Sequence, residues 1–215
     1  MTKTHDLYNL ALRDRDMLPT IAIGAAGTGK TYGGIGAAVE WLKTRSRQLI
    51  VTRPNVSFAD KNGFLPGSER EKMGPWVRPI EQNLRLHGVS VPQQESWEKH
   101  GTLQFLPLEY IQGLTFDNAF ILVDECQNMT FEQLKVLLTR QGKYSKLVLC
   151  GDIAQISPRF QGSGLAKLID MVRVLDLNVH LIEFTHEDIL RSKQCAEWIK
   201  AFDKYEGVVG GQVHP

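Results

Sequence analysis

The sequence predicts an α/β domain built on a mostly parallel β-sheet with helices on both faces. Short apolar runs of strand length alternate along the chain with segments whose apolar residues recur at helical spacing. Strands that are separated by helices pair in parallel and carry those helices on both faces. Charged residues directly follow several of the apolar runs, at the strand ends where such sheets bind ligands.

The first half of the chain is expected to begin with a helix, because Leu7, Leu10 and Ala11 have amphipathic spacing. Glycines and prolines mark residues 54–79 as a long connection. Connections of this length are uncommon in compact domains, so this one is expected to be functional. The expected segments are a helix over 5–16, a strand ending at 23, a helix over 32–43, a strand over 48–52, a helix over 77–86, an irregular stretch over 87–100 and a strand over 102–106.

In the second half, Thr130 followed by Gln133 is typical of a capping box at a helix start. The other boundaries follow from the apolar runs and stripes. The expected segments are a strand from 119 that ends in two acids, a helix over 130–139, a strand over 146–152, a helix over 163–174, a strand over 180–185 and a helix over 187–205. Residues 1–206 are expected to form a single domain, and residues 207–215 a flexible tail.

The glycine-rich stretch from Gly24 to Thr31 matches the P-loop pattern G-x-x-x-x-G-K-[ST]. In such a loop the backbone N–H groups surround phosphate oxygens, and the lysine, here Lys30, reaches the β- and γ-phosphates from a solvent-exposed position. The Thr31 hydroxyl is expected to ligate Mg²⁺. The alternative, a chance match, is disfavoured by the apolar strand before the loop and the helix after it. The expected ATP contacts are Gly24, Ala25, Ala26, Gly27, Thr28, Gly29, Lys30, Thr31 and Tyr32.

Acidic and polar residues at later strand ends complete the expected site. Asp124 is a candidate Mg²⁺ ligand, and Glu125 a candidate base that orients the attacking water. Gln155 is a candidate sensor of the γ-phosphate. The alternatives are a solvated acidic turn for the acids and a simple turn for Gln155. Arg53 either contacts phosphate or nucleic acid, or makes a structural ion pair.

Together these motifs resemble the PhoH family of P-loop ATPases, which is related to superfamily 1 helicases. The resemblance extends from about residue 18 to residue 204. The residues that carry it are Gly24–Thr31, Thr52–Pro54, Gly63–Gly67, Arg78 and Pro79, Tyr110, Gly113, Thr115, Asp117–Phe120, Asp124 and Glu125, Gln127 and Asn128, Leu138–Arg140, Gly151 and Asp152, Gln155, Ser163–Leu165 and Arg191. It implies a RecA-like P-loop NTPase fold.

Four positions depart from the family pattern. Ala25 stands where the family usually has a proline, and Gln112 and Leu114 stand where it usually has two arginines. The glutamine that the family carries upstream of Tyr8 to read adenine is replaced by His5 or is missing.

The resemblance implies an ATPase that uses Mg²⁺ and acts with RNA or single-stranded nucleic acid, with unwinding as an extension of that role. It also suggests a homo-oligomeric ring, a hexamer, in which an arginine finger acts in trans. The candidates for this finger are Arg53, Arg140, Arg159 and Arg191, and the family pattern favours Arg191. The alternative for Arg191 is an ion pair with Asp188 or Glu187. The connection over 54–79 is the expected nucleic-acid or partner surface, since it interleaves aromatic and basic residues.

Two other functional classes remain open from the sequence. A small-molecule P-loop kinase would have an arginine-bearing lid and no catalytic glutamate after Asp124, so Glu125 disfavours it. A scaffold that binds ATP without hydrolysis would not need Glu125 for its function. Turnover measured without an added acceptor separates these classes from an ATPase.

Composition adds exclusions rather than a function. The 215 residues carry a net charge of +1, so overall charge does not indicate a nucleic-acid-binding protein. The N-terminal residues lack the apolar region of a signal peptide, and no apolar run has membrane-spanning length, so we expect a cytoplasmic protein with no membrane contact. The three cysteines have no zinc-site spacing, and Cys126 and Cys150 are expected to be buried thiols.

Overall fold

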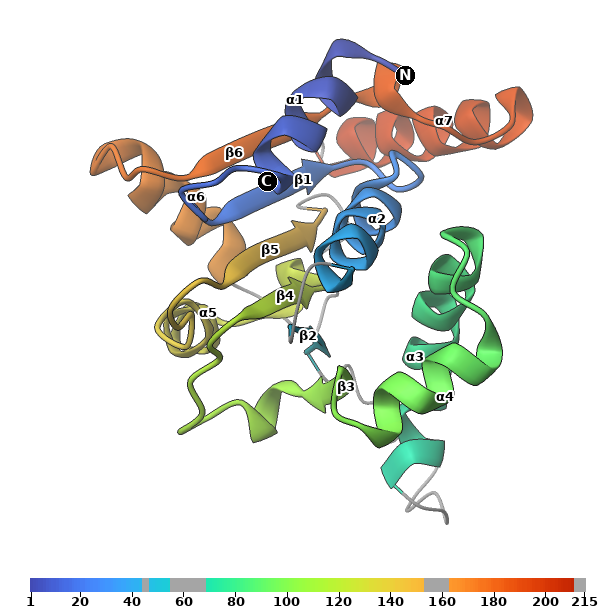
Figure 1. Ribbon diagram of the computed structural model, residues 1–215. Helices are drawn as coiled ribbons and strands as arrows, with labels where there is room; N and C mark the ends of the chain where they lie inside the picture. Colours follow the sequence, from blue (N-terminus) through green and yellow to red (C-terminus); the bar gives the residue numbers. More distant parts are fainter. Residues whose placement is uncertain (44–46, 55–68, 153–162, 211–215) are drawn as a thin grey trace.

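The computed structural model describes residues 1–43, 47–54, 69–152 and 163–210, which form an α/β fold around one sheet (Figure 1). Its six strands all pair in parallel, in the order β3-β2-β4-β5-β1-β6. The expectation of a parallel sheet is therefore confirmed. The strands are β1 (Thr20–Gly24), β2 (Gln48–Arg53), β3 (Leu103–Pro107), β4 (Ala119–Val123), β5 (Lys146–Gly151) and β6 (His180–Phe184).

Helices cover both faces of this sheet, as expected. The α-helices are α1 (Lys3–Leu12), α2 (Lys30–Leu42), α3 (Glu69–Leu86), α4 (Val91–Lys99), α5 (Phe131–Leu138), α6 (Gly164–Val174) and α7 (Lys193–Gly210). The core is divided accordingly into two clusters, one shared by α1, α2 and α3 and the other by α5 and α6. Figure 1 shows α2, α3 and α4 on one side of the strands and α5 and α6 on the other.

Strand β4 shows why the sequence forms a buried central strand. Phe120 and Leu122 belong to the cluster under α2 and α3, while Ile121 and Val123 belong to the cluster under α5 and α6. All four side chains are fully buried, because successive residues of a strand point to opposite faces. A strand that is buried on both faces needs the continuous apolar run that the sequence shows.

The segment between β2 and β3 is more helical than expected. Helix α3 begins at Glu69 and includes Pro75 and Pro79, although prolines usually interrupt helices. Val77, Ile80 and Leu84 are almost completely buried at helical spacing, so packing against the core outweighs the proline penalty. Residues 55–68, the first part of the expected connection, lie outside the described residues.

Helix α4 was expected to be irregular, and this expectation is wrong. Ser90 caps its start, since its hydroxyl accepts a hydrogen bond from the backbone N–H of Gln93 at 3.4 Å. The buried Gln94 donates to the carbonyls of Val89, at 2.9 Å, and Glu81, at 3.3 Å, which fixes α4 against the end of α3. Polar side chains whose hydrogen bonds form inside the protein therefore hold α4 in place. Such side chains give no apolar stripe in the sequence.

The two terminal helices also differ from the expected bounds. Helix α1 ends at Leu12 rather than at residue 16. Helix α7 begins only at Lys193, because a short 3₁₀ turn over His186–Asp188, with Thr185 as its cap, precedes it. It continues to Gly210, so the expected tail over 207–215 begins as helix, and residues 211–215 lie outside the described residues. That residues 1–206 fold as a single domain stays a prediction.

Lys146 is fully buried at the start of β5 and ties α1 to the sheet. Its ammonium donates hydrogen bonds to the carbonyl oxygens of Ala11, at 2.7 Å, and Leu18, at 2.6 Å. Burial lowers the pKa of Lys146 to about 8, because removing a charged amine from water is costly, and the nearby Asp14 only partly offsets this effect.

We expect the stability of the unmodified chain, relative to a Lys146→Met variant, to rise between about pH 8 and pH 10.5. Across this window the unfolded chain keeps the proton that folded Lys146 loses, and stability rises with pH wherever the unfolded state binds more protons. Urea unfolding of both proteins at about pH 7 and about pH 9.5 measures the change. A stability difference that stays constant or falls with pH would contradict it.

Candidate nucleotide-binding site

The P-loop lies where β1 ends and α2 begins. Gly27 and Gly29 have φ angles of 77° and 83°, the left-handed region that glycine adopts without strain. At Gly27 a side chain is excluded for a second reason, because a Cβ atom there would lie 2.7 Å from Cγ of Arg191. The glycines of the motif therefore serve both the loop conformation and the close approach of the segment that carries Arg191.

Lys30 is folded back into the hollow of this loop. Its Nζ donates to the carbonyl oxygens of Gly24, at 2.6 Å, and Ala25, at 2.8 Å, and lies 3.2 Å from the Thr28 hydroxyl. The expectation of a solvent-exposed ammonium is wrong, because these carbonyls hold it half-buried. Burial lowers the pKa of Lys30, although nearby carboxylates partly offset the effect. The ammonium of Lys30 is thus held at the centre of the loop by neutral carbonyl groups.

Thr31 and Asp124 meet at the mouth of the loop, although 93 positions separate them in the chain. The Thr31 hydroxyl donates to Oδ1 of Asp124 at 2.8 Å, and burial raises the pKa of Asp124, with the neighbouring Glu125 adding to the effect. One hydroxyl and one carboxylate suit Mg²⁺, which takes few protein ligands when phosphates supply others. The described residues contain no group of three or more acidic, histidine or cysteine side chains that could hold a metal without a nucleotide.

Glu125 follows β4 in a left-handed conformation, with a φ of 56°. Such a conformation is costly for a residue with a side chain and is concentrated at functional sites. Its Oε2 accepts a hydrogen bond from Nε2 of Gln127 at 2.6 Å, and Oε1 of Gln127 accepts one from the backbone N–H of Asp152 at 3.1 Å. Gln127 is buried and links the ends of β4 and β5. The sequence indicated no role for it beyond family resemblance.

Arg53 lies beside both acids at the end of β2. Its guanidinium nitrogens are 3.8 Å from Oδ2 of Asp124 and 3.7 Å from Oε1 of Glu125. Both alternatives proposed for Arg53 therefore have a basis, since it pairs with the acids and also lines the cleft above the P-loop. The long distances indicate ion pairing without a close hydrogen bond.

These groups share one cleft of about 390 Å³ at the carboxyl ends of the strands. Its wall includes Lys30, Thr31, Arg53, Asp124, Glu125 and Arg191. Three further residues, Pro79, Ile80 and Asn83, come from α3, which the sequence did not place at the site. Gln155 lies outside the described residues, so its expected role stays a prediction.

Arg191 reaches this cleft in its own chain. The backbone N–H of Leu190 donates to the Gly27 carbonyl at 2.9 Å, which fixes the segment against the P-loop. In the part of the chain that the structure describes, no ion pair involves Arg191, and the buried Asp188 is instead hydrogen-bonded to Thr2 and Thr185. The alternative of an ion pair with Asp188 or Glu187 is therefore not found.

His5 is a structural residue. Its Nε2 lies 3.0 Å from the Thr28 carbonyl, and its Nδ1 lies 2.8 Å from the Thr2 hydroxyl, so both ring nitrogens are used within the protein. His5 is buried and links α1 to the P-loop. It is therefore not free to read a base.

A family model described as "PhoH-like protein" matches residues 1–203 of the chain. The chain belongs to the PhoH-like protein family. It is 38% identical over 200 residues to a PhoH-like protein of Bacillus subtilis (strain 168), which covers 92% of this chain and 61% of that protein. It is 39% identical over 188 residues to one of Mycobacterium tuberculosis (strain H37Rv), which covers 86% of this chain and 52% of that protein. The chain thus spans about half to three fifths of the length of these relatives.

The PhoH-like fold seen here also resembles that of a solved viral protein. The large terminase of the thermophilic bacteriophage D6E aligns with a TM-score of 0.57 at 16% identity, over 95% of this chain and 49% of the terminase. A second structure of the terminase, in complex with ATP-gamma-S, aligns with a TM-score of 0.54 at 17% identity, over 93% of this chain and 48% of the terminase. At this identity the likeness shows the fold alone, and it confirms the expected α/β class.

Among the described residues, no helix is both long enough and apolar enough to cross a membrane. Cys126 and Cys150 are buried free thiols, as expected, and Cys195 is an exposed one.

Proposed function

We propose that this PhoH-like chain binds ATP with Mg²⁺ and hydrolyses its γ-phosphate bond. The observation that carries the proposal is the meeting of Lys30, the Thr31–Asp124 pair and Glu125 in one cleft at the strand ends. Each group has the chemistry that one part of phosphoryl transfer to water requires.

In this proposal Lys30 leaves the Gly24 and Ala25 carbonyls and moves to the β- and γ-phosphates. Thr31 and Asp124 would hold Mg²⁺, which would neutralise charge on the phosphate oxygens. Glu125, oriented by the hydrogen bond from Gln127, accepts a proton from the attacking water at its carboxylate. Arg191 and Arg53 supply positive charge from opposite sides of the P-loop as charge develops on the transferred group.

The two alternative functions, a small-molecule kinase and a non-hydrolysing scaffold, predict results that differ from those of an ATPase in a single assay. A kinase would release little phosphate until an acceptor is added, and a scaffold would bind ATP without turnover. Supplying ATP and Mg²⁺ alone and measuring phosphate release therefore distinguishes the three. Glu125 favours hydrolysis. A carboxylate that is oriented beside the Thr31–Asp124 pair would have no use in a passive scaffold.

We expect a Lys30→Ala variant to lose ATP turnover by at least about 10²–10³-fold, the usual cost of removing one transition-state donor. The reason is that the ammonium of Lys30 is held inside the P-loop by the Gly24 and Ala25 carbonyls, where the proposal places the β- and γ-phosphates. Phosphate release measures turnover, and thermal unfolding shows whether the fold persists without these hydrogen bonds. Normal turnover by a folded Lys30→Ala protein would refute the P-loop assignment.

Coupling to RNA or single-stranded nucleic acid is also part of the proposal. The expected surface over 54–79 lies mostly outside the described residues, but α7 offers a second one. Its Trp198 and Phe202 rings are stacked at 5.8 Å and are both exposed, and Lys200 lies between them in sequence. Exposed aromatic rings next to cations suit stacked bases. Stimulation of ATP turnover by single-stranded RNA, measured at stated salt, tests this coupling.

Assembly into a ring stays a prediction. The exposed aromatic face of α7 is consistent with a homo-oligomer as well as with nucleic acid. Arg191 already lines the cleft of its own chain, so the proposed hydrolysis does not require an arginine from a second copy.

A further inference from the structure

Arg53 is placed beside Asp124 and Glu125 by the backbone of the sheet. The backbone N–H of Asp124 donates to the Thr52 carbonyl at 2.9 Å, which joins the ends of β2 and β4 at the point where the acids begin. Val51 belongs to the cluster under α2 and α3, and alternation along β2 directs Arg53 to the same side of the sheet. The sheet itself therefore fixes Arg53 next to both acids.

The four carboxylate oxygens of Asp124 and Glu125 divide into two sets. Neutral donors hold one oxygen of each acid. Oδ1 of Asp124 accepts a hydrogen bond from the Thr31 hydroxyl at 2.8 Å, and Oε2 of Glu125 accepts one from Gln127 at 2.6 Å. The other two oxygens, Oδ2 and Oε1, lie 3.8 Å from NH1 and 3.7 Å from NH2 of Arg53. One guanidinium thus bridges both acids, with one nitrogen for each.

The bridge by Arg53 neutralises the acids without occupying positions close to them. Its distances are too long for hydrogen bonds, whereas Mg²⁺ needs oxygen ligands at about 2.0–2.1 Å in octahedral geometry. The two acids and the Thr31 hydroxyl supply only part of such a set, and phosphate oxygens complete it when a nucleotide is bound. Arg53 is therefore a competitor that a divalent cation has to displace, and the nucleotide supplies the ligands that favour the displacement.

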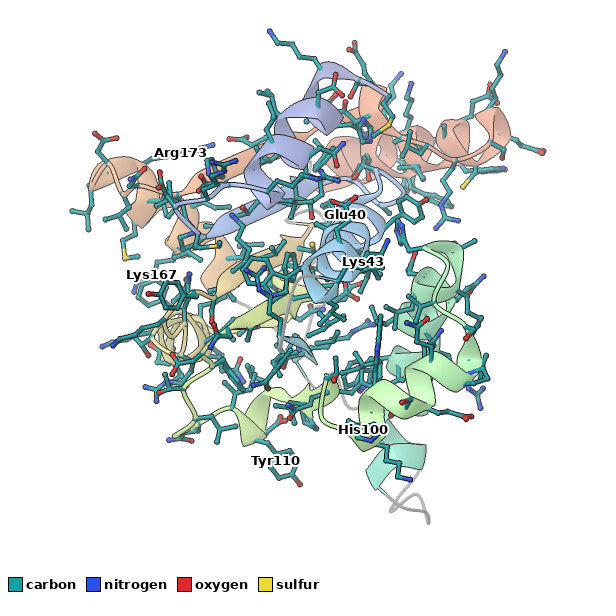
Figure 2. All side chains as sticks on the ribbon, viewed as in Figure 1. Glu40, Lys43, His100, Tyr110, Lys167 and Arg173 are labelled. Atoms are coloured by element: carbon teal, nitrogen blue, oxygen red, sulfur yellow. The ribbon has the colours of Figure 1, made fainter. Side chains whose placement is uncertain are left out.

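The charge of Arg53 is screened less than the charge of a surface ion pair. Arg173, labelled in Figure 2, pairs with Glu183 where the two side chains are 58% and 53% exposed. The side chain of Arg53 is only 28% exposed, and that of Asp124 only 15%. Because water weakens interactions between charges less at partly buried positions, the guanidinium opposes a second cation at Asp124 effectively.

We propose that Arg53 keeps divalent cations away from Asp124 until a nucleotide is bound, so that Mg²⁺ enters and leaves the site together with the nucleotide. The inference rests on the proposed ATP site and adds how that site takes up and releases its metal. Once displaced from the acids, the guanidinium of Arg53 is free to contact the γ-phosphate oxygens. When the products leave, Arg53 pairs with the acids again and opposes retention of the ion.

The test measures binding of Mn²⁺ alone, and of Mn²⁺ in the presence of ADP, from the electron paramagnetic resonance signal of free Mn²⁺. Mn²⁺ is the probe because it suits the same oxygen ligands as Mg²⁺. Arg53→Gln is compared with Arg191→Gln, which removes the same charge from the same cleft. Arg191 is a matched control because it makes no ion pair with an acid in the described part of the chain. Thermal unfolding shows whether each variant is folded.

The unmodified chain and Arg191→Gln are expected to bind Mn²⁺ weakly without ADP and much more tightly with it. Arg53→Gln is expected to bind Mn²⁺ alone at least about tenfold more tightly than the unmodified chain, because the repulsion from a unit charge about 4 Å away is removed. Adding Asp124→Asn to Arg53→Gln is expected to abolish this gain, which would place the ion at Asp124.

Equal affinity of Arg53→Gln and the unmodified chain for Mn²⁺ alone would overturn the inference. An equal gain in Arg191→Gln would overturn it too, since the effect would then belong to the net charge of the cleft. Tight binding of Mn²⁺ by the unmodified chain without ADP would overturn it whether or not the variants fold. None of these measurements requires turnover. A gain in Arg53→Gln, in a chain that releases no phosphate from ATP, would support the inference and refute hydrolysis instead.

Discussion

A Glu125→Gln variant is expected to hydrolyse ATP about 10²–10⁴-fold more slowly than the unmodified chain while still binding ATP. Glutamine has nearly the shape of glutamate, but its amide does not accept a proton from water at neutral pH. Its amide oxygen can still accept the hydrogen bond that Gln127 donates, so the turn after β4 is expected to persist. Phosphate release and calorimetric ATP binding, both with Mg²⁺, measure the two effects separately.

The matched control is Glu132→Gln, the same change at an exposed position in the first turn of α5. It is expected to leave both ATP turnover and ATP binding close to those of the unmodified chain. If Glu125→Gln lowers binding and turnover together, Glu125 belongs to the metal site rather than to the attacking water. If the unmodified chain hydrolyses ATP and Glu125→Gln lowers neither turnover nor binding, Glu125 is not the base for the attacking water. The scaffold alternative gains support only if ATP binds and neither protein releases phosphate.

The sheet and the phosphate site were predictable because both depend on local sequence patterns. The fully buried run in β4 indicates a strand, and the capping box at Thr130 indicates the start of α5, both as found. Gly27, Gly29 and Lys30 stand at fixed spacing because the loop geometry requires it. Parallel pairing then brings the ends of β1, β2 and β4 to one edge, which is why Asp124 meets Thr31.

Features that depend on partners distant in sequence were not predictable. The hydrogen bonds of Gln94 to the end of α3 hold α4 in place, and no periodicity shows them. Gln127 lies in a 3₁₀ turn, and its side-chain amide is fixed by the backbone N–H of Asp152 at the end of β5. Only this placement lets Gln127 orient Glu125. The placement of Arg191 depends on the backbone contact between Leu190 and Gly27, which spans most of the chain.

An Arg191→Ala variant is expected to lose about 10³–10⁵-fold in ATP turnover, the range measured for an arginine that stabilises the transferring phosphoryl group. Arg191 borders the P-loop at Gly27, and no carboxylate among the described residues pairs with it, so its charge is available to the γ-phosphate. A Lys193→Ala variant is the control, because Lys193 is an exposed cation two residues further on that does not line the cleft. Phosphate release at saturating ATP measures both.

Mixing Lys30→Ala with Arg191→Ala protein separates action within one chain from action between copies. Because Arg191 lines the cleft of its own chain, each site in the mixture lacks either Lys30 or Arg191, and turnover is expected to stay at the level of the two variants alone. Recovered turnover would show that one copy supplies Arg191 to the site of another. That result would require head-to-tail contacts between copies, which close into a ring when their rotation allows it.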